Sequence, residues 1–399
     1  MTTAVAARVT ADADRARRAL VLVFAVSGVV FSSWVSRIPA VRDDLGLSAG
    51  DLGLVLLAMS GGAVLALPSS GAVVVRLGTA ATVRAAALAC TVGLALAGLA
   101  HSVPVLVLGM ILMGLGFGSW DVAMNVEGTE VERRFARSLM PHLHAAYSVG
   151  AVAGALLGAA LNATGVSTPV HLVGVAVLAG AVTVVACRAL LPASAAGERV
   201  RGRHPLAAWR EPRTLMVGVV VLVFALAEGS ASDWLALALV DGYHLPHAGG
   251  VLGFALFMAA MTLGRLLGTG LLDRFGRVVV LRASALLAVA GLLFVILGGS
   301  VVLAAVGSVL WGLGAALGFP VGMSAGADDP AHAAARVSVV SSIGYTAFLS
   351  GPPLIGFLAD RFGVLSALGV VVAVMVLGLL AAGATRELAP RVVACGSPS

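Results

Sequence analysis

The chain has 399 residues, of which 60% are hydrophobic and only 11% charged, and its mean hydropathy is +1.05. A water-soluble globule of this length could not hide so much apolar surface, so the composition excludes an ordinary soluble protein. The 25 basic residues are all arginine, and the sequence pI is about 10.2. Because these arginines lie in short gaps between long apolar runs and form no basic face, we do not expect the chain to bind nucleic acid.

Twelve apolar segments are long enough to cross a hydrocarbon layer of about 30 Å. The first six lie at residues 18–40, 51–75, 81–100, 103–127, 138–162 and 169–191. The other six lie at residues 213–240, 247–272, 278–298, 300–325, 336–358 and 363–384. We therefore predict an all-α integral membrane protein whose 12 transmembrane helices form two pseudo-symmetric six-helix bundles, 18–191 and 213–384. A polar linker covers 192–212, and the terminal tails cover 1–17 and 385–399.

The placement of arginine predicts the orientation in the membrane. With the amino terminus in the cytoplasm, 22 arginines fall in cytoplasmic segments, and only Arg37, Arg42 and Arg361 fall outside. Short cytoplasmic loops are enriched in basic residues, so both termini and the linker are expected in the cytoplasm. The first apolar segment is too long for a signal peptide and is expected to be retained. The chain is thus predicted to be a multi-pass protein of the cell membrane, embedded in the lipid bilayer as a monomer.

The two predicted bundles repeat one sequence pattern. An offset of 200 residues superimposes identical residues of the first helix of each bundle, namely residues 21–25 on 221–225, Ser32 on Ser232 and Trp34 on Trp234. An offset of 198 aligns identical residues of later helices, among them Arg76, Gly78, Gly114, Gly116 and Tyr147 with Arg274, Gly276, Gly312, Gly314 and Tyr345. Two related six-helix halves are a recurrent transporter architecture, in which the solute binds near the midplane between the halves.

Two motifs carry a resemblance to a known family. Residues 266–277 read Leu-Leu-Gly-Thr-Gly-Leu-Leu-Asp-Arg-Phe-Gly-Arg, which resembles the cytoplasmic-loop signature of the major facilitator superfamily. Residues 356–363, Gly-Phe-Leu-Ala-Asp-Arg-Phe-Gly, look like an echo of it. More narrowly, residues 33–39, 44–48 and 118–125, with the 140–147 stretch, are similar to the rhizopine-transporter-like (MosC-like) branch. The resemblance implies the major facilitator fold and a conformational latch formed by Asp273, Arg274 and Arg277 at the cytoplasmic surface.

Three departures from the family pattern bear on function. Val75 stands where the first copy of the loop signature usually has aspartate, which implies a weak charge lock in that half. Met110 stands where many proton-coupled members carry arginine, and the fifth predicted helix has no Gly-Pro pair of the drug-antiporter type. These departures argue against proton-coupled drug efflux.

Ionisable side chains inside the bilayer are functional candidates, because each costs about 2.5 to 3.5 kcal/mol to insert on translocon scales. Glu228 lies near the middle of its helix and is the leading candidate for a proton-coupling group; a structural hydrogen bond is the alternative. Asp121 and Asn125 are four residues apart and should share a helix face, either meeting solute or proton in a cavity or pairing with arginines at the helix end. Asp233 is expected to be structural, with Arg37 as its candidate partner. Arg37 is expected to pair with Asp43 or Asp44 at the outer surface, and binding of an anionic solute is its alternative role.

Aromatic and imidazole side chains complete the candidate solute cavity. His142 and His144 point about 200° apart on a helix, so at most one faces the cavity, and His144 is favoured because Tyr147 follows on nearly the same face. The duplication pairs Tyr147 with Tyr345, a symmetric pair suited to ring-bearing or hydroxyl-rich solutes; interhelical hydrogen bonding is the alternative. Trp34 and Trp234 could close the cavity from outside or anchor the helices at the membrane surface.

The sequence predicts neither a metal site nor a cofactor. Cys90, Cys187 and Cys395 are odd in number and far apart, and the two neighbouring histidines have no further ligand at metal-binding spacing. No glycine-rich loop ends in Gly-Lys-Ser/Thr, so ATP is not expected to drive the protein.

The function predicted from the sequence is secondary transport by alternating access. The expected solute is a small polar molecule such as a sugar, polyol or inositol derivative, with protons or sodium as the coupling ion. Proton-driven efflux of amphipathic compounds is the runner-up. A membrane enzyme is disfavoured because no nucleophile and base stand at a useful spacing, and a receptor because the longest segment outside the membrane is the linker.

Overall fold

The computed structural model describes residues 3–135, 139–191, 205–329 and 332–387. These residues contain helices and no strand, and 12 helical spans are long and apolar enough to cross a membrane. The predicted fold class is therefore confirmed. The polar stretch 192–204, which makes up most of the predicted linker, and residues 388–399 of the predicted tail lie outside the described residues.

The first half consists of seven helices. They are α1 (Thr3–Val35), α2 (Ile38–Leu45), α3 (Ala49–Leu77), α4 (Thr79–Gly98), α5 (Val103–Phe135), α6 (Met140–Ala163) and α7 (Thr168–Ala186), followed by the short 3₁₀ turn η1 (Cys187–Ala189). Helix α1 begins well before the predicted span, so residues 3–17 are helical and continuous with the first transmembrane helix. Ser48 caps α3 in a capping box with Asp51, which explains why this helix starts where it does.

The second half repeats this order with three interruptions. Its elements are η2 (Pro205–Arg210), α8 (Pro212–Ser230), the π turn η3 (Ala231–Leu235), α9 (Ala236–Tyr243), α10 (His247–Phe275), α11 (Arg277–Leu297), α12 (Val301–Ala315), α13 (Gly318–Gly326), α14 (Ala333–Phe362), α15 (Val364–Ala367), α16 (Gly369–Ala381) and η4 (Ala382–Thr385). The tenth span is broken between α12 and α13, whereas its counterpart α5 is continuous. Proline at position 320 accounts for this difference, because the matching residue of α5 is Val122.

Glycines set the distances between helices, and they do so alike in both halves. A Cβ atom on Gly93 would lie 2.6 Å from the Gly109 carbonyl oxygen where α4 crosses α5. A Cβ atom on Gly291 would lie 2.6 Å from the Gly307 carbonyl oxygen where α11 crosses α12. The two pairs are related by the same offset of 198 that aligns the sequences. Since lipid offers no hydrophobic drive for helix association, such close backbone approach is a main source of packing energy.

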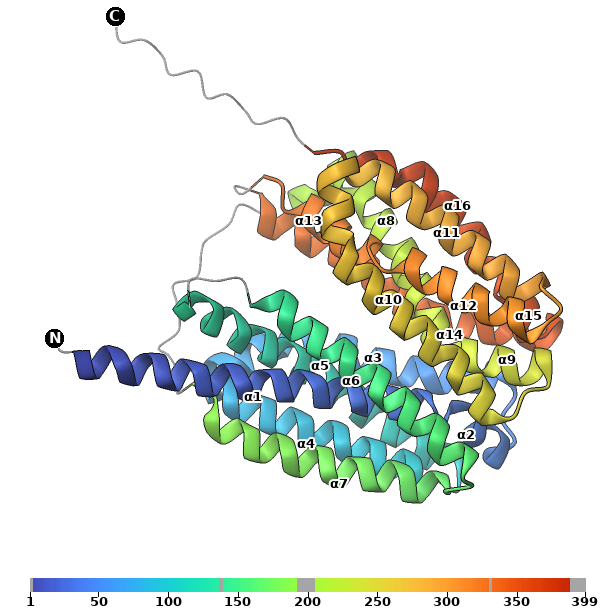
Figure 1. Cartoon of the computed structure of the whole chain (residues 1–399), viewed down its shortest axis with the longest axis horizontal. Coiled ribbons are helices and arrows are strands. Elements are labelled where there is room, and N and C mark those ends of the chain that lie inside the picture. The colour runs from blue at the N-terminus through green and yellow to red at the C-terminus, as the bar shows by residue number, and fades with distance from the viewer. Residues whose placement is uncertain (1–2, 136–138, 192–204, 330–331, 388–399) are drawn as a thin grey trace, which may run out of the picture.

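The two halves meet at one end of the molecule and diverge toward the other (Figure 1). We call the end that carries the start of α1 and the end of α16 the terminal end, and the opposite end, with α2, α9 and α15, the distal end. At the distal end α3 crosses α14 closely, because Gly53 has no side chain. A Cβ atom on Gly53 would lie only 2.7 Å from the Pro352 carbonyl oxygen. Helices α6 and α10 form the other main contact between the halves.

Charged residues tie the halves together at the distal end. Arg42 donates to both carboxylate oxygens of Asp241, with a distance of 2.9 Å from Nη2 to Oδ1. His247 Nε2 lies 2.9 Å from Asp43 Oδ2. Asp360 Oδ2 accepts from the Gly50 backbone N–H at 3.0 Å. Within the described residues, every hydrogen bond that joins the two halves lies at this end.

We predict that Gly93→Ala and Gly291→Ala each lower the free energy of unfolding by about 1 to 3 kcal/mol, because the new methyl group collides with backbone and the helices must separate. Thermal unfolding of the purified protein measures the effect. Gly71→Ala in α3 and Gly270→Ala in α10 are matched controls, because a Cβ there meets open space. The controls should be neutral or slightly stabilising. Equal losses in all four variants would contradict the packing argument.

Candidate functional site

Glu228 has a cationic partner inside the membrane span. It lies in α8, near the middle of the span Pro212–Tyr243, and Arg265 of α10 donates from Nη2 to both of its carboxylate oxygens, at 3.0 and 2.9 Å. The side chains are 31% exposed for Arg265 and 23% exposed for Glu228. The orientation argument counted Arg265 among the cytoplasmic arginines, and this was wrong, because Arg265 lies ten residues inside the end of α10 at Phe275. Without Arg265, 21 of the 22 arginines remain in the predicted cytoplasmic segments, against three outside.

A break in the tenth span provides Arg265 with a second partner. Pro320 has no N–H, so it cannot bond the carbonyl four residues earlier, which belongs to Ala316. Arg265 Nε donates to this freed Ala316 oxygen at 3.4 Å. The guanidinium is therefore held between a side chain of α8 and the backbone between α12 and α13. An unpaired carbonyl in a membrane span needs such a partner, and a proline placed in a predicted span was the available sequence signal.

The backbone of the seventh span is also irregular beside Glu228. The π turn Ala231–Leu235 begins three residues later, and the Ser232 hydroxyl donates to the Glu228 carbonyl oxygen at 3.1 Å. Asp233 stands in this turn, half-buried, and makes no hydrogen bond or ion pair with any described residue. Short π turns are common at functional sites, so this segment belongs to the candidate region.

Arg37 does not have the partners expected from the sequence. It is 3% exposed and donates to His171 Nδ1 at 2.9 Å, to Asn162 Oδ1 at 2.6 Å and to the Val166 carbonyl at 2.9 Å. The predicted ion pairs of Arg37 with Asp43 or Asp44, and with Asp233, are absent among the described residues, so both predictions were wrong. The physical reason is that Arg37 turns into the first half and satisfies its N–H groups with neutral acceptors there.

The first half contributes a carboxylate and an amide. Asn125 Nδ2 donates to Asp121 Oδ1 at 3.0 Å and to the Asp121 carbonyl at 2.8 Å, which confirms that the two residues share one face of α5. Both are half-buried. No arginine pairs with Asp121 within the described residues, in contrast to Glu228.

Two tyrosine side chains lie near the polar pairs Asp121–Asn125 and Glu228–Arg265. Tyr147 of α6 lies within reach of the charges of Asp121, Glu228 and Arg265. Tyr345 of α14 lies within reach of Asp121. Both rings are half-buried. Tyr147 of the first half is thus close to polar groups of both halves, and Tyr345 of the second half is close to Asp121 of the first.

The histidine and tryptophan candidates differ in accessibility. His144 is exposed, meets Phe24 edge to face at a centroid distance of 5.4 Å and lies within reach of the Arg265 charge. Trp34 and Trp234 are 1% and 0% exposed, so neither ring is accessible to solute or lipid in this conformation. His144 therefore joins the site that we propose below, and the two tryptophans do not.

The sequence duplication shows that the Asp121–Asn125 pair and the Glu228–Arg265 pair are not copies of one another. With the offsets of 200 and 198, the residues that match Glu228, Arg265 and Pro320 are Gly28, Leu67 and Val122. Conversely, Phe319 and Met323 match Asp121 and Asn125. Each half therefore carries a polar group that the other half lacks, on a common helix frame.

The three residues of the predicted latch do not act as one cluster here. Arg277 donates to Asp328 Oδ1 at 2.7 Å, and Arg274 lies over the Phe275 ring at 5.2 Å. Asp273 makes no hydrogen bond or ion pair in the part of the chain that the structure describes. Arg277 thus belongs to a charged network within the second half, in which Arg213 also bonds Asp328, at 2.8 Å.

Two further charged residues at the terminal end were missed by sequence reasoning. Glu127 of α5 is 1% exposed and accepts hydrogen bonds from the Thr79 hydroxyl and, at 2.6 Å, from the Leu191 N–H. It joins the start of α4 to the segment after α7, which is a structural role. Glu211 pairs with Arg336 at 2.6 Å, and this guanidinium holds the pKa of the Glu211 carboxyl below its usual range.

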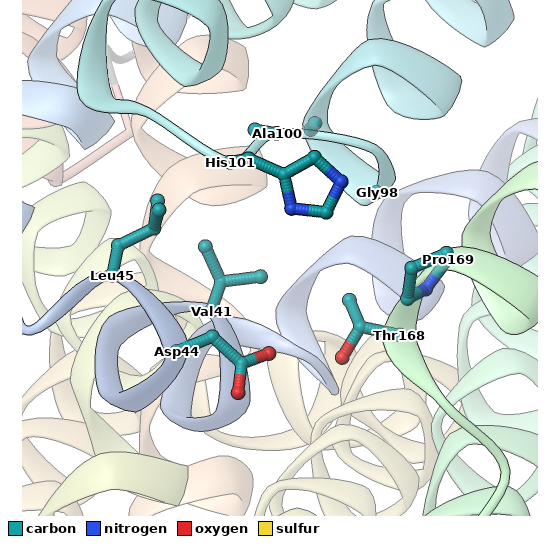
Figure 2. A pocket seen from close by; sticks show the side chains of 9 residues that line it. Val41, Asp44, Leu45, Gly98, Ala100, His101, Thr168 and Pro169 are labelled. Carbon is teal, nitrogen blue, oxygen red and sulfur yellow. The ribbon is translucent and has the colours of Figure 1, made fainter.

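A separate pocket opens at the distal end of the first half (Figure 2). Its volume is about 290 Å³. The lining residues come from α2, from the end of α4 and the residues after it, and from the start of α7: Val41, Asp44, Leu45, Ala97, Gly98, Ala100, His101, Thr168 and Pro169. It lies within one half, at the far end from the central polar groups, and does not belong to the same site. No group of three or more histidine, cysteine or acidic residues placed to hold a metal occurs among the described residues.

Comparison with known proteins identifies the family. The sequence profile described as Major Facilitator Superfamily matches residues 19–352 and 252–394. The chain belongs to the major facilitator superfamily. It is therefore a secondary transporter by its fold, and a multi-pass membrane protein.

Three relatives match most of the chain, and one of them bears on the narrower resemblance. A transporter designated y4wD from Sinorhizobium fredii (strain NBRC 101917 / NGR234) is 33% identical over 84% of this chain and 89% of that protein. An MFS-type transporter of Yersinia pestis is 31% identical over 93% of this chain and 94% of that protein. Membrane protein MosC of Rhizobium meliloti is 28% identical over 89% of this chain and 86% of that protein, which confirms the predicted similarity to the MosC-like branch.

Solved structures share the fold at low identity. A mutant form of the nucleoside transporter NupG has a TM-score of 0.79 at 13% identity, over 92% of this chain and 99% of that one. A bacterial homologue of the human lysosomal transporter Spinster, in an inward-facing and unoccupied conformation, has a TM-score of 0.76 at 15% identity, over 95% of this chain and 99% of that one. At these identities the likeness shows the fold alone.

We predict that Arg265→Gln lowers the free energy of unfolding by about 1 to 3 kcal/mol, because it leaves the Glu228 carboxylate without a cation in the span. Glu228→Gln should lower the free energy of unfolding less, since Arg265 still donates to the Ala316 carbonyl oxygen. The double variant should be more stable than Arg265→Gln alone, and thermal unfolding of all four proteins gives the coupling energy. Additive losses would show that the ion pair contributes nothing to stability.

Proposed function

We propose that this transporter carries a small neutral polar solute, such as a sugar, polyol or inositol derivative, by proton-coupled alternating access. The observation that supports it most is the presence of two unlike polar groups, Asp121 with Asn125 in the first half and Glu228 with Arg265 in the second, both within reach of Tyr147. A solute between them would bind both halves at once. This is what alternating access requires, because the halves must move together around one occupied site.

The chemistry of the site favours hydroxyl-rich solutes. Carboxylate and amide oxygens accept hydrogen bonds from hydroxyl groups, and the Arg265 Nη1 group, which has no partner among the described residues, can donate to them. Tyr147, Tyr345 and His144 offer ring faces and further polar atoms. An anionic solute is disfavoured, because the one guanidinium of the site is already paired with Glu228.

The coupling role is proposed for Asp121 first. Glu228 was the leading candidate on sequence grounds, but both of its carboxylate oxygens already accept from Arg265 Nη2, so a neutral Glu228 would leave this guanidinium without its anion. Asp121 has an amide as its side-chain partner and can exchange a proton without leaving a cation unpaired. Glu228 and Arg265 then act together in binding solute.

The arginine asymmetry supports a cytoplasmic position for the terminal end. In that orientation the closed distal end faces outward, and the conformation described here is inward-facing. The half-exposed central groups would then be reached from the cytoplasm.

The orientation is tested by labelling in expressing bacteria. After replacement of the native cysteines, Ser102→Cys at the distal end should react with a membrane-impermeant maleimide added to intact spheroplasts. Trp209→Cys, which is 45% exposed at the terminal end, should react only after lysis. The reverse pattern would overturn the proposed orientation.

Coupling is tested in proteoliposomes with labelled myo-inositol, D-glucose and D-xylose. Asp121→Asn should keep solute exchange but lose accumulation driven by an imposed pH gradient, because the amide cannot carry a proton. Glu228→Gln should raise the KM for exchange at least about tenfold, the effect of losing a charged hydrogen bond of about 1.4 kcal/mol.

Three results would contradict these assignments. Normal exchange with lost accumulation in Glu228→Gln would return the coupling role to that residue. Accumulation driven by a sodium gradient and not by a pH gradient would show that sodium is the coupling ion in place of the proton. Transport of none of the three solutes, with efflux of an amphipathic dye such as ethidium, would favour the alternative of amphipathic-compound efflux.

A further inference from the structure

The chain contains the same four-residue helix-end motif twice, at opposite ends of the molecule, and we call each copy a corner. Residues 273–276 and 360–363 both read Asp-Arg-Phe-Gly. The first copy ends α10 at the terminal end, and the second ends α14 at the distal end. Gly276 and Gly363 take φ angles of 74° and 80°, and each arginine lies over the ring of the next phenylalanine, at 5.2 and 6.0 Å. The two corners are therefore alike in sequence and in backbone conformation.

The aspartate of the distal corner binds the other half. Asp360 Oδ2 accepts from the Gly50 N–H at 3.0 Å and lies 3.3 Å from the Ser48 hydroxyl, both at the start of α3. A helix N-terminus carries partial positive charge and favours a carboxylate. The contact depends on glycine, because a Cβ on Gly50 would collide with the same Asp360 oxygen.

The aspartate of the terminal corner, Asp273, makes no hydrogen bond or ion pair with a described residue. Helix α10 packs on α6 as α14 packs on α3, so the matching target is the start of α6. There the carboxylate of Glu132 accepts from the N–H groups of Leu139 and Met140, at 2.6 and 2.9 Å. One corner is engaged in this conformation while the other is not.

We propose that the two aspartates hold opposite conformations of the transport cycle. Asp360 keeps the distal end closed in the conformation described here. Asp273 keeps the terminal end closed in the opposite conformation, where it replaces Glu132 at the start of α6. The family resemblance assigns a latch to the terminal corner alone; the distal latch, its target on α3 and its opposite effect follow from the contacts of Asp360. The proposal does not depend on the identity of the solute.

The test measures distances between spin labels in the solute-free protein in lipid nanodiscs. The native cysteines are replaced first. One label pair, Leu99→Cys with Leu297→Cys, reports on the distal end, and another, Leu77→Cys with Val279→Cys, reports on the terminal end; all four positions are exposed. Each series is repeated in an Arg42→Gln background, which removes a second distal link and brings the open population into measurable range.

Asp360→Asn should raise the ratio of distal-open to distal-closed protein about twofold to thirtyfold, the range for losing a favourable carboxylate at a helix N-terminus. Gly50→Ala should do the same, because it displaces the Asp360 carboxylate without changing its charge. Asp273→Asn should move the ratio in the opposite direction. Asp360→Glu should recover part of the closed population.

Asp44→Asn is the matched control, since this carboxylate is exposed at the same end and makes no bond to the other half in the described residues. It should leave both distance distributions unchanged. Unchanged distributions for both Asp360→Asn and Gly50→Ala would overturn the proposal, as would a shift in the same direction for Asp273→Asn and Asp360→Asn. Failure to transport any sugar or polyol would refute the proposed function and leave these distance results as they stand.

Discussion

Inside a bilayer, every charge and every unpaired backbone group must find its partner within the protein, because neither lipid nor bulk water can supply one. Arg265 meets this requirement for two groups at once, the Glu228 carboxylate and the Ala316 carbonyl that Pro320 leaves without a donor. Glu228 needs its cation, and the broken helix needs a donor. The ion pair and the interrupted span are therefore parts of one arrangement, and this arrangement occurs in the second half of the chain only.

The two halves share a helix frame and differ in the chemistry that they place on it. Glycine contacts such as Gly93 on Gly109 and Gly291 on Gly307 are preserved at the same offset, since backbone approach of this closeness admits no other residue. The polar positions follow no such rule. A symmetric frame lets two bundles rock against each other, whereas unlike polar groups allow one half to hold a charged pair and the other to hold an acid beside an amide.

In the described conformation, the contacts that close the molecule lie apart from the central polar groups that we propose as the solute site. Closure at the distal end uses direct charged contacts, Arg42 with Asp241 and Asp360 with the start of α3. The central groups remain half-exposed, which suits a site that must exchange its contents. Since the hydrogen bonds that join the halves in the described residues lie at the distal end, an opening of that end must break them.

The sequence by itself determined the number of spans, the two related halves, the family and the shared face of Asp121 and Asn125, because each depends on apolar run length, on repeat offset or on spacing within one helix. The partners of long-range charges were decided only by the tertiary structure. Glu228 and Arg265 lie on different helices, and Arg37 donates its hydrogen bonds to neutral acceptors and not to the acids that follow it in sequence. In spans made almost entirely of alanine, valine, leucine and glycine, the sequence contains little that sets the rotation of each helix about its axis. Packing at glycine crossings sets that rotation, and with it the choice of which charges meet.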